Sequence, residues 1–250
     1  DDETVIGTSF FIMDHVVGNI YWELLLPGCD PNQRREIYLS MNDTIAKLHN
    51  VDFDKVNLAD YGKHENYMDR QIHRWTKQYK DSETQMIPEI NELIEWLPKN
   101  IPSDQETSIV HGDFRLDNMI FDPITHEVKA ILDWELSTLG NPIADFTYHM
   151  MSWRLPAGAK GLGMMGSDLK SLNIPSESEY AELYYKKTGR EKIDNWDFYM
   201  AYNIFRLAGI AQGIVGRVRD GTASSSEAKN YEAFVPILGK LGWSIVEGIK

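Results

Sequence analysis

The residues of this chain best suited to chemistry are residues 111–118, His-Gly-Asp-Phe-Arg-Leu-Asp-Asn, and Asp133 in the later stretch Ile-Leu-Asp-Trp. A carboxylate such as Asp113 could receive or orient the proton of an attacking hydroxyl, and Asn118 and Asp133 could supply oxygen ligands to Mg²⁺. A base and two metal ligands in this order are what phosphoryl transfer to a hydroxyl requires.

The elements expected around these residues would gather them at one point. The spacing follows the pattern His-x-Asp-x-x-x-x-Asn with a second metal-binding Asp at the end of the next hairpin. Residues 107–110 and 128–132 are β-rich, residues 118–121 form a short apolar run, and Asp122-Pro123 favours a turn. Because a lone Asp in a loop is usually a turn former, the assignment rests on the joint spacing.

Other polar side chains near the motif have two interpretations each. Arg115 could grip phosphate oxygens in a bidentate manner, which makes it a second catalytic candidate, or it could simply neutralise Asp117. His111 is expected to buttress the loop by hydrogen bonding. Asp145, near the start of a helix predicted from residue 141, could bind the backbone of the loop or simply favour the helix N-terminus.

The sequence of the motif resembles that of the aminoglycoside phosphotransferase and choline kinase-like family. It is most similar to the kinase-like domain that occurs alone in bacteria or fused to acyl-CoA dehydrogenases, and residues 7–13, 61–62, 94–98 and 195–201 extend the similarity. The resemblance implies an α+β, protein kinase-like fold with a mostly helical C-terminal lobe and a short catalytic β-hairpin. It also implies ATP and Mg²⁺ as cofactors, a small hydroxylated molecule as acceptor, and an acyl-CoA dehydrogenase as a fused or associated partner.

The same resemblance divides the chain unequally. Kinases of this group hold ATP beneath an N-terminal lobe with a phosphate-covering loop and a Lys–Glu pair, for which this chain has no room. Thr8 to Asp14 resembles the last strand of that lobe. Residues 1–28 are therefore predicted to be this strand and the hinge, and residues 29–250 the C-terminal catalytic and substrate-binding lobe. The sequence is then a fragment, with most of the N-terminal lobe absent.

The hinge is expected to meet the adenine ring through its backbone groups. The resemblance assigns this role to four consecutive residues, Met13, Asp14, His15 and Val16, with Met13 packing behind the ring.

Composition is that of a globular domain. A chain of 250 residues, 42% hydrophobic and 25% charged, can bury a sizeable core. Its one cysteine, Cys29, excludes an internal disulfide. Without a signal-like segment or a long apolar run, the chain is expected to be soluble and intracellular, in an organelle that the sequence does not reveal.

Charge restricts the partners. The net charge of −13 argues against nucleic acid and against an anionic membrane. Residues 1–154 hold 13 basic and 27 acidic side chains, whereas residues 155–250 hold 12 and 11. The C-terminal helices, which the resemblance makes the acceptor wall, are thus not acidic enough to favour a polycation. Arg206, Arg217 and Arg219 instead suggest an anionic acceptor.

Apolar periodicity and capping residues predict six further helices. They cover residues 31–50, 66–80, 88–97, 177–188, about 195–217 and about 227–248. Residues 155–170 are rich in glycine, but they follow no strand and carry no nucleotide-site lysine pattern. This segment is predicted to be a flexible lid on the substrate side.

Two classes of function fit these observations. The first is an ATP-dependent small-molecule kinase, with a hydroxyacyl thioester suggested as acceptor by the association with acyl-CoA dehydrogenases. The second is a noncatalytic nucleotide-binding or interaction module of a larger protein, suggested by the missing lobe. A metal hydrolase using His111, Asp113 and Asp133 is a weaker alternative, because no further His-rich ligand cluster accompanies them.

Overall fold

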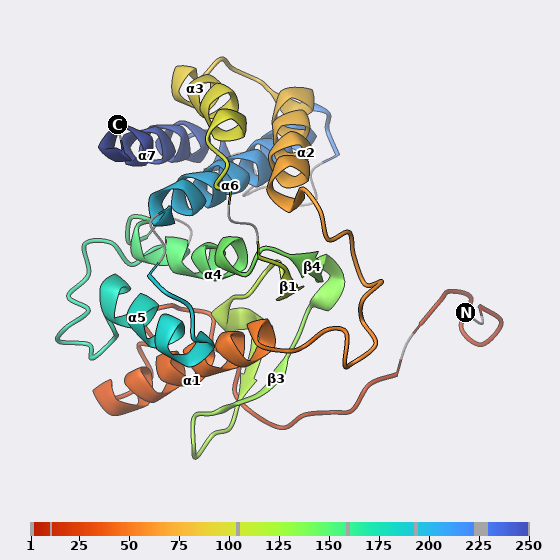
Figure 1. Ribbon diagram of the computed structural model, residues 1–250, viewed down its shortest axis with the longest axis vertical. Coiled ribbons are helices and arrows are strands. Elements are labelled where there is room, and N and C mark those ends of the chain that lie inside the picture. The colour runs from red at the N-terminus through yellow and green to blue at the C-terminus, as the bar shows by residue number, and fades with distance from the viewer. Residues whose placement is uncertain are drawn as a thin grey trace.

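The computed structural model describes residues 3–10, 12–103, 106–158, 161–192, 195–222 and 230–249. Most of these residues are helical, and the strands are short (Figure 1). The helices are α1 (Pro31–His49), α2 (Tyr67–Ser82), α3 (Pro88–Trp96), α4 (Pro142–Met150), α5 (Glu177–Thr188), α6 (Trp196–Arg219) and α7 (Phe234–Ile249). The strands are β1 (Ser108–Val110), β2 (Met119–Phe121), β3 (Val128–Ile131) and β4 (Thr138–Gly140).

Local capping explains where several helices begin. The Asp30 side chain accepts hydrogen bonds from the first backbone N–H groups of α1, and the side-chain oxygen of Gln33 accepts one from the backbone N–H of Asp30. Asn141 caps α4 in the same way, with Pro142 at its first position. Ser176 caps α5, which ends at Gly189 in the left-handed region at φ 71°. These helices confirm the sequence predictions.

The central helix is α6, and it is buried along most of its length. Helices α2, α3 and α7 pack around its upper side in Figure 1, and α4 lies beneath it. Helices α1 and α5 pack together at the opposite end of the molecule. Aromatic residues join α5 to α4, and the rings of Phe146 on α4 and Tyr184 on α5 stack with their centroids 3.8 Å apart. Strand β1 (Ser108–Val110), which leads into the motif at residues 111–118, contacts both α1 and α4.

Two antiparallel strand pairs carry the motif. Strand β2 pairs with β3, with Met119 opposite Ile131, as predicted for the hairpin. Strand β1 pairs with β4, with Ser108 opposite Gly140. Strand β4 was not predicted, because Thr138-Leu139-Gly140 has a single apolar residue followed by glycine and so forms no β-rich run. This second pairing returns the chain beside β1 and encloses the whole catalytic segment between the two pairs.

The predicted strand Thr8 to Asp14 is wrong for the described residues, which exclude Phe11. They are exposed and form no strand pairing. A strand needs a neighbouring strand to bind its backbone groups, and the described residues offer none here. The segment lies to one side of the helical body (Figure 1). The division at residues 28 and 29 stays a prediction.

Two further expectations are modified. The last helix begins at Phe234, later than the predicted residue 227, and residues 227–229 lie outside the described part of the chain. In the glycine-rich segment, Met164 is fully buried, and the hydroxyl of Tyr38 lies 3.3 Å from its sulfur. This contact anchors the segment where a freely moving lid was expected. No helix in the described ranges is long and apolar enough to cross a membrane.

Candidate active site

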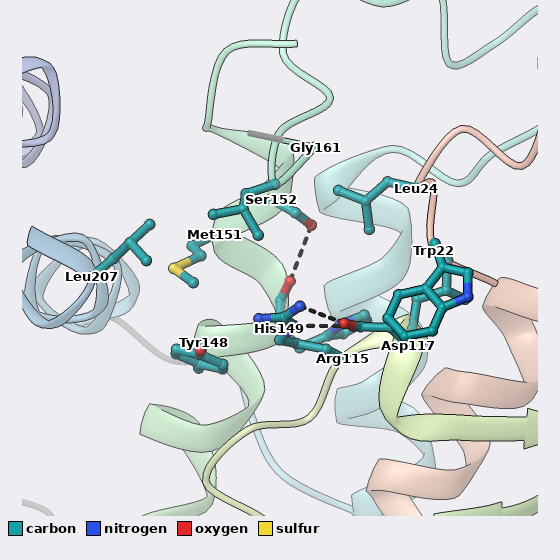
Figure 2. Close-up of a pocket in the computed structure, with 12 residues that line it drawn as sticks. Trp22, Leu24, Arg115, Asp117, Tyr148, His149, Met151, Ser152, Gly161 and Leu207 are labelled. Atoms are coloured by element: carbon teal, nitrogen blue, oxygen red, sulfur yellow. Dashed lines mark hydrogen bonds and ion pairs between the residues drawn. The ribbon is translucent and has the colours of Figure 1, made fainter. Parts of the chain in front are cut away.

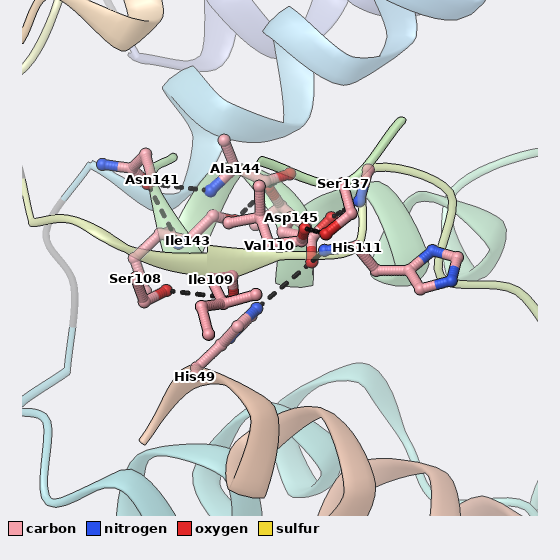
Figure 3. A network of polar contacts seen from close by, with 12 residues as sticks. His49, Ser108, Ile109, Val110, His111, Ser137, Asn141, Ile143, Ala144 and Asp145 are labelled. Atoms are coloured by element: carbon pink, nitrogen blue, oxygen red, sulfur yellow. Dashed lines mark hydrogen bonds and ion pairs between the residues drawn. The ribbon is translucent and has the colours of Figure 1, made fainter. Parts of the chain in front are cut away.

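The first residues of the loop at residues 111–118 are held by a buried carboxylate, that of Asp145 in the first turn of α4 (Figure 3). Its two oxygens accept hydrogen bonds from the backbone N–H groups of His111 and Gly112, both at 2.8 Å. Gly112 has φ +84°, and an added Cβ would lie 2.7 Å from the carbonyl oxygen of Leu136. The geometry confirms the predicted backbone bond, and it also agrees with the helix N-terminus interpretation of Asp145.

A buried histidine, His49, also contacts the carboxylate of Asp145. His49 Nε2 lies 3.2 Å from the carboxylate, and His49 Nδ1 lies 2.7 Å from the hydroxyl of Tyr184. Burial keeps the pKa of His49 below its usual value, so the ring is neutral, donates from Nε2 and accepts from the phenol at Nδ1. Burial alone would raise the pKa of Asp145, but the hydrogen bonds from His49 and the two backbone groups hold it below its usual value.

His111 buttresses the loop, as the sequence predicts. Its Nδ1 accepts from the backbone N–H of Asp113 at 3.2 Å, and its Nε2 donates to the carbonyl of Leu132 at 2.9 Å. The ring is fully buried against Trp134, with centroids 4.9 Å apart. His111 thus joins Leu132, the residue before Asp133, to the loop at residues 111–118.

Asp113 is held at both of its carboxylate oxygens. The Tyr148 hydroxyl donates to Oδ1 at 2.8 Å, and Asn118 Nδ2 donates to Oδ2 at 3.1 Å. Burial raises the pKa of Tyr148, so the phenol stays protonated and remains a donor. Tyr148 lies one helical turn from Asp145 on α4, and the sequence analysis did not identify it. The carboxylate is therefore fixed in orientation and remains partly accessible.

Asn118 and Asp133 are brought together by the hairpin. Leu132 N–H donates to the carbonyl of Asn118 at 2.8 Å, which extends the pairing of β2 and β3 by one step and leaves Asp133 beside Asn118. Asn118 Nδ2 also donates to the backbone carbonyl of Asp113 at 2.9 Å. Since its amide nitrogen is thus occupied, its oxygen is the atom available to a metal. Asp133 is exposed and adopts φ 65°, an uncommon conformation outside glycine.

Arg115 makes a bidentate pair with Asp117. Its Nε lies 3.0 Å from Oδ1, and its Nη2 contacts Oδ2. This is the geometry of the alternative in which Arg115 neutralises its neighbour. The pair lines a small cavity of about 60 Å³ together with Tyr148 and His149 of α4 and Trp22 (Figure 2).

The structure separates the three arginines of α6. Arg206 reaches the catalytic loop, where its guanidinium donates to the carbonyl of Gly112 and lies 4.3 Å over the ring of Tyr148. Arg217 and Arg219 lie in the last turn of the helix, and Arg219 pairs with Asp220. At 1.5 Å per residue, that turn is about 15–20 Å from Arg206. Only Arg206 can therefore act beside the motif.

These elements define a phosphotransferase-like site, and comparison with known families agrees. The model of the phosphotransferase enzyme family matches residues 1–182. The chain therefore belongs to this family, as the resemblance of its motif predicted.

Two relatives in sequence are acyl-CoA dehydrogenase family members. Acyl-CoA dehydrogenase family member 10 of Mus musculus is 43% identical over 97% of the chain, and family member 11 of Homo sapiens is 39% identical over 96%. The chain spans 23% and 31% of the lengths of these proteins, respectively. It is thus similar to a part of each.

Solved structures support the fold. A crystal structure from Ralstonia eutropha, assigned as an aminoglycoside phosphotransferase, is 49% identical, has a TM-score of 0.94, and is matched over 99% of this chain and 75% of that one. The choline kinase of Cryptosporidium parvum matches 94% of this chain and 71% of its own with a TM-score of 0.60, and at 12% identity it supports the fold alone. The kinase-like fold with a mostly helical lobe is confirmed.

Proposed function

We propose that the chain carries the catalytic lobe of an ATP-dependent small-molecule phosphotransferase, which transfers the γ-phosphate to a hydroxyl group. The observation that carries this proposal is the carboxylate of Asp113, fixed by Tyr148 and Asn118 at the end of the hairpin whose backbone pairs Asn118 with Leu132, the residue before Asp133. A fixed base next to oxygen ligands is what in-line transfer demands, because catalysis of this reaction is mostly positioning and charge stabilisation.

Asp113 would act on the acceptor. With both oxygens held by donors, the carboxylate cannot rotate away from an incoming hydroxyl, and its half-buried position leaves one side open to the acceptor. It would orient the hydroxyl and take its proton as the oxygen attacks the γ-phosphorus, while the bond to the leaving diphosphate breaks. Asp145 and His111 hold the loop so that this orientation is built in before substrate arrives.

The residues at the hairpin end fit Mg²⁺. The oxygen of Asn118 and the exposed carboxylate of Asp133 are hard oxygen ligands, which Mg²⁺ prefers. The described residues contain no group of three or more His, Cys, Asp or Glu side chains that could hold a metal. A site with so few protein ligands suits a cation that shares its coordination with water and substrate phosphates. When bound, Mg²⁺ would neutralise negative charge on those phosphates.

Arg115 and the N-terminal segment are proposed to complete the nucleotide site. Two nitrogens of Arg115 hold Asp117, and its remaining Nη1 could reach a phosphate oxygen. Met13, Asp14, His15 and Val16 are proposed to face the adenine. Support comes from Asn19, three residues after Val16. Its backbone exchanges two hydrogen bonds with that of Phe121, on the strand that follows Asn118, and so joins this segment to the site.

The acceptor is proposed to be a hydroxylated metabolite, such as a hydroxyacyl thioester. The support is association: the relatives named above are acyl-CoA dehydrogenase family members, and the chain matches only part of each. An acyl-CoA dehydrogenase, fused or associated, is accordingly the proposed partner. We propose an intracellular location, where both ATP and acyl thioesters are made.

Calorimetric titration of the full-length protein with ATP, with and without Mg²⁺, tests the metal site. We expect Mg²⁺ to tighten ATP binding by about tenfold or more, because Asn118 and Asp133 would bind a cation bridging the phosphates. Asp133→Asn should remove that gain, whereas Glu127→Gln, at an exposed carboxylate of the same hairpin, should retain it. Equal ATP affinity with and without Mg²⁺ would contradict the proposed site.

A further inference from the structure

A second cavity, of about 440 Å³, adjoins the catalytic loop and is distinct from the one in Figure 2. It lies between α2, the loop at residues 62–63, residues 135–138 after Asp133, and α6. Gly62 packs directly against Thr138 and Leu139, so that the loop at 62–63 reaches the edge of β4. The cavity thus borders the motif, although most of its wall comes from segments outside it.

The charge of this cavity is opposite to that of the chain. Its charged lining residues are four cations and one acid: Lys63, Arg70, Arg74, Arg206 and Glu135. The chain as a whole has a net charge of −13. None of the four cations forms an ion pair with any residue that the structure describes. A positive cavity in an acidic protein attracts an anionic ligand.

Arg206 is the buried member of the set. It is 6% exposed, and its Nε has no hydrogen-bond partner among the described residues. A buried cation with an unmade hydrogen bond is costly unless another group completes it. Its guanidinium lies 4.3 Å over the ring of Tyr148, whose hydroxyl binds Asp113. Arg206 therefore connects the cavity to Asp113 through Tyr148.

The arginines of α2 are held at the cavity by local contacts. Arg70 donates to the carbonyl of Lys63 at 2.8 Å, which ties the loop at 62–63 to the helix. Arg74 lies 5.3 Å from the centroid of the Trp75 ring, and Arg206 lies at the same distance from that ring. Like charges four residues apart on a helix repel each other, and no described carboxylate pairs with either arginine. An anion between them would offset this repulsion.

We propose that this cavity is the anion subsite of the acceptor: it binds a phosphate or carboxylate group of a hydroxylated substrate whose hydroxyl lies at Asp113. The inference rests on the proposed phosphotransferase function and specifies its substrate class. Arg70 and Arg74 are the specificity-determining residues, because guanidinium groups bind oxyanions in a bidentate manner and stay charged. Arg206, already bonded to Gly112, sets the distance between the anion and the base.

Thermal unfolding tests the subsite without any enzymatic turnover. The full-length protein is melted in inorganic phosphate, in acetate and in chloride at equal ionic strength. At ten times the dissociation constant, the preferred oxyanion should raise the Tm by about 3 °C or more above chloride. The stronger of the phosphate and acetate effects identifies the group. The gain should vanish in the double variant Arg70→Gln/Arg74→Gln and persist in Lys77→Gln, one turn along α2 and outside the cavity.

Failure to see any oxyanion effect in the wild-type protein would overturn the subsite, and so would an effect that survives in the double variant. Turnover then separates the subsite from the proposed function. For a hydroxy acid, the KM should rise about tenfold or more in Arg70→Gln with little change in kcat, whereas the KM for the uncharged amide of the same acid should not change. Equal KM values for acid and amide in the wild type would refute the subsite and leave the kinase function standing. Oxyanion binding that depends on Arg70 and Arg74, without phosphorylation of any acceptor, would leave an anion site in this cavity and refute the function.

Discussion

Acid should destabilise this protein through His149, a residue of α4 behind the small cavity. Its ring is buried, with Nε2 3.0 Å from the hydroxyl of Tyr180, and burial lowers its pKa from 6.5 to about 4. The unfolded chain binds a proton at this residue below pH 6.5, whereas the folded protein does so only near pH 4. The contribution of the neutral ring to the free energy of unfolding is therefore complete above pH 6.5, and it is lost as the pH falls toward about 4.

The magnitude follows from that difference in pKa. The interval from 6.5 to about 4 corresponds to about 3 kcal/mol at 1.36 kcal/mol per pH unit, and about 2 kcal/mol of it falls between pH 7 and pH 5. Burial also lowers the pKa of His49, which contacts the carboxylate of Asp145. Its contribution is present in the wild type and in a His149 variant alike, so it cancels when the two are compared.

Urea denaturation at pH 7 and pH 5 measures this effect. In His149→Gln, the loss of unfolding free energy between the two pH values should be smaller than in the wild type by about 2 kcal/mol, because the amide cannot take up a proton. His73→Gln, at an exposed position of α2, controls for the substitution itself. An equal pH-dependent loss in His149→Gln and wild type would refute the reasoning.

Two substitutions test how the loop is held. Asp145→Asn replaces a buried acceptor of three hydrogen bonds with a group that must place an NH₂ against a donor. It should lower the free energy of unfolding by about 3 kcal/mol in urea titrations, and a loss below about 1 kcal/mol would argue against the clamp. Gly112→Ala adds a Cβ at φ +84°, 2.7 Å from the Leu136 carbonyl oxygen, and should cost about 1–3 kcal/mol by the same assay. Unchanged stability there would mean that the loop relaxes freely.

The motif could be predicted from sequence because its determinants are local. Asp113, Asn118 and the strands around them are set by the spacing within one segment, and the helices by caps such as Asp30 and Asn141. The buttressing role of His111 was predicted correctly because its partners, Asp113 and Leu132, lie in this segment. For Asp145, the backbone hydrogen bond to the loop was one of two interpretations, and the structure agrees with both. Strand β4 was not predicted, because Thr138-Leu139-Gly140 carries no β-rich run and its extended form is set by its pairing with β1.

The remaining parts of the site depend on long-range packing. Tyr148 binds Asp113 from α4, and His49 binds Asp145 from α1. No periodicity within α1 or α4 indicates such pairs. The role of Arg206 could have been inferred from the sequence, since a charged residue in an otherwise apolar stretch of helix is expected to have a specific partner. The grouping of Arg70 and Arg74 with Arg206 could not be predicted, because it arises where α2 crosses α6.

The measurement that tests the central claim most directly is turnover by Asp113→Asn in the full-length protein. The amide can keep both hydrogen bonds, since the Tyr148 hydroxyl can also accept, so the loop should stay in place. We expect MgATP affinity by calorimetry to change less than about twofold, and kcat for a hydroxylated acceptor to fall by about 100-fold or more, as for loss of a general base. Glu127→Gln in the same hairpin should retain full turnover. Undiminished phosphorylation by Asp113→Asn would contradict the account.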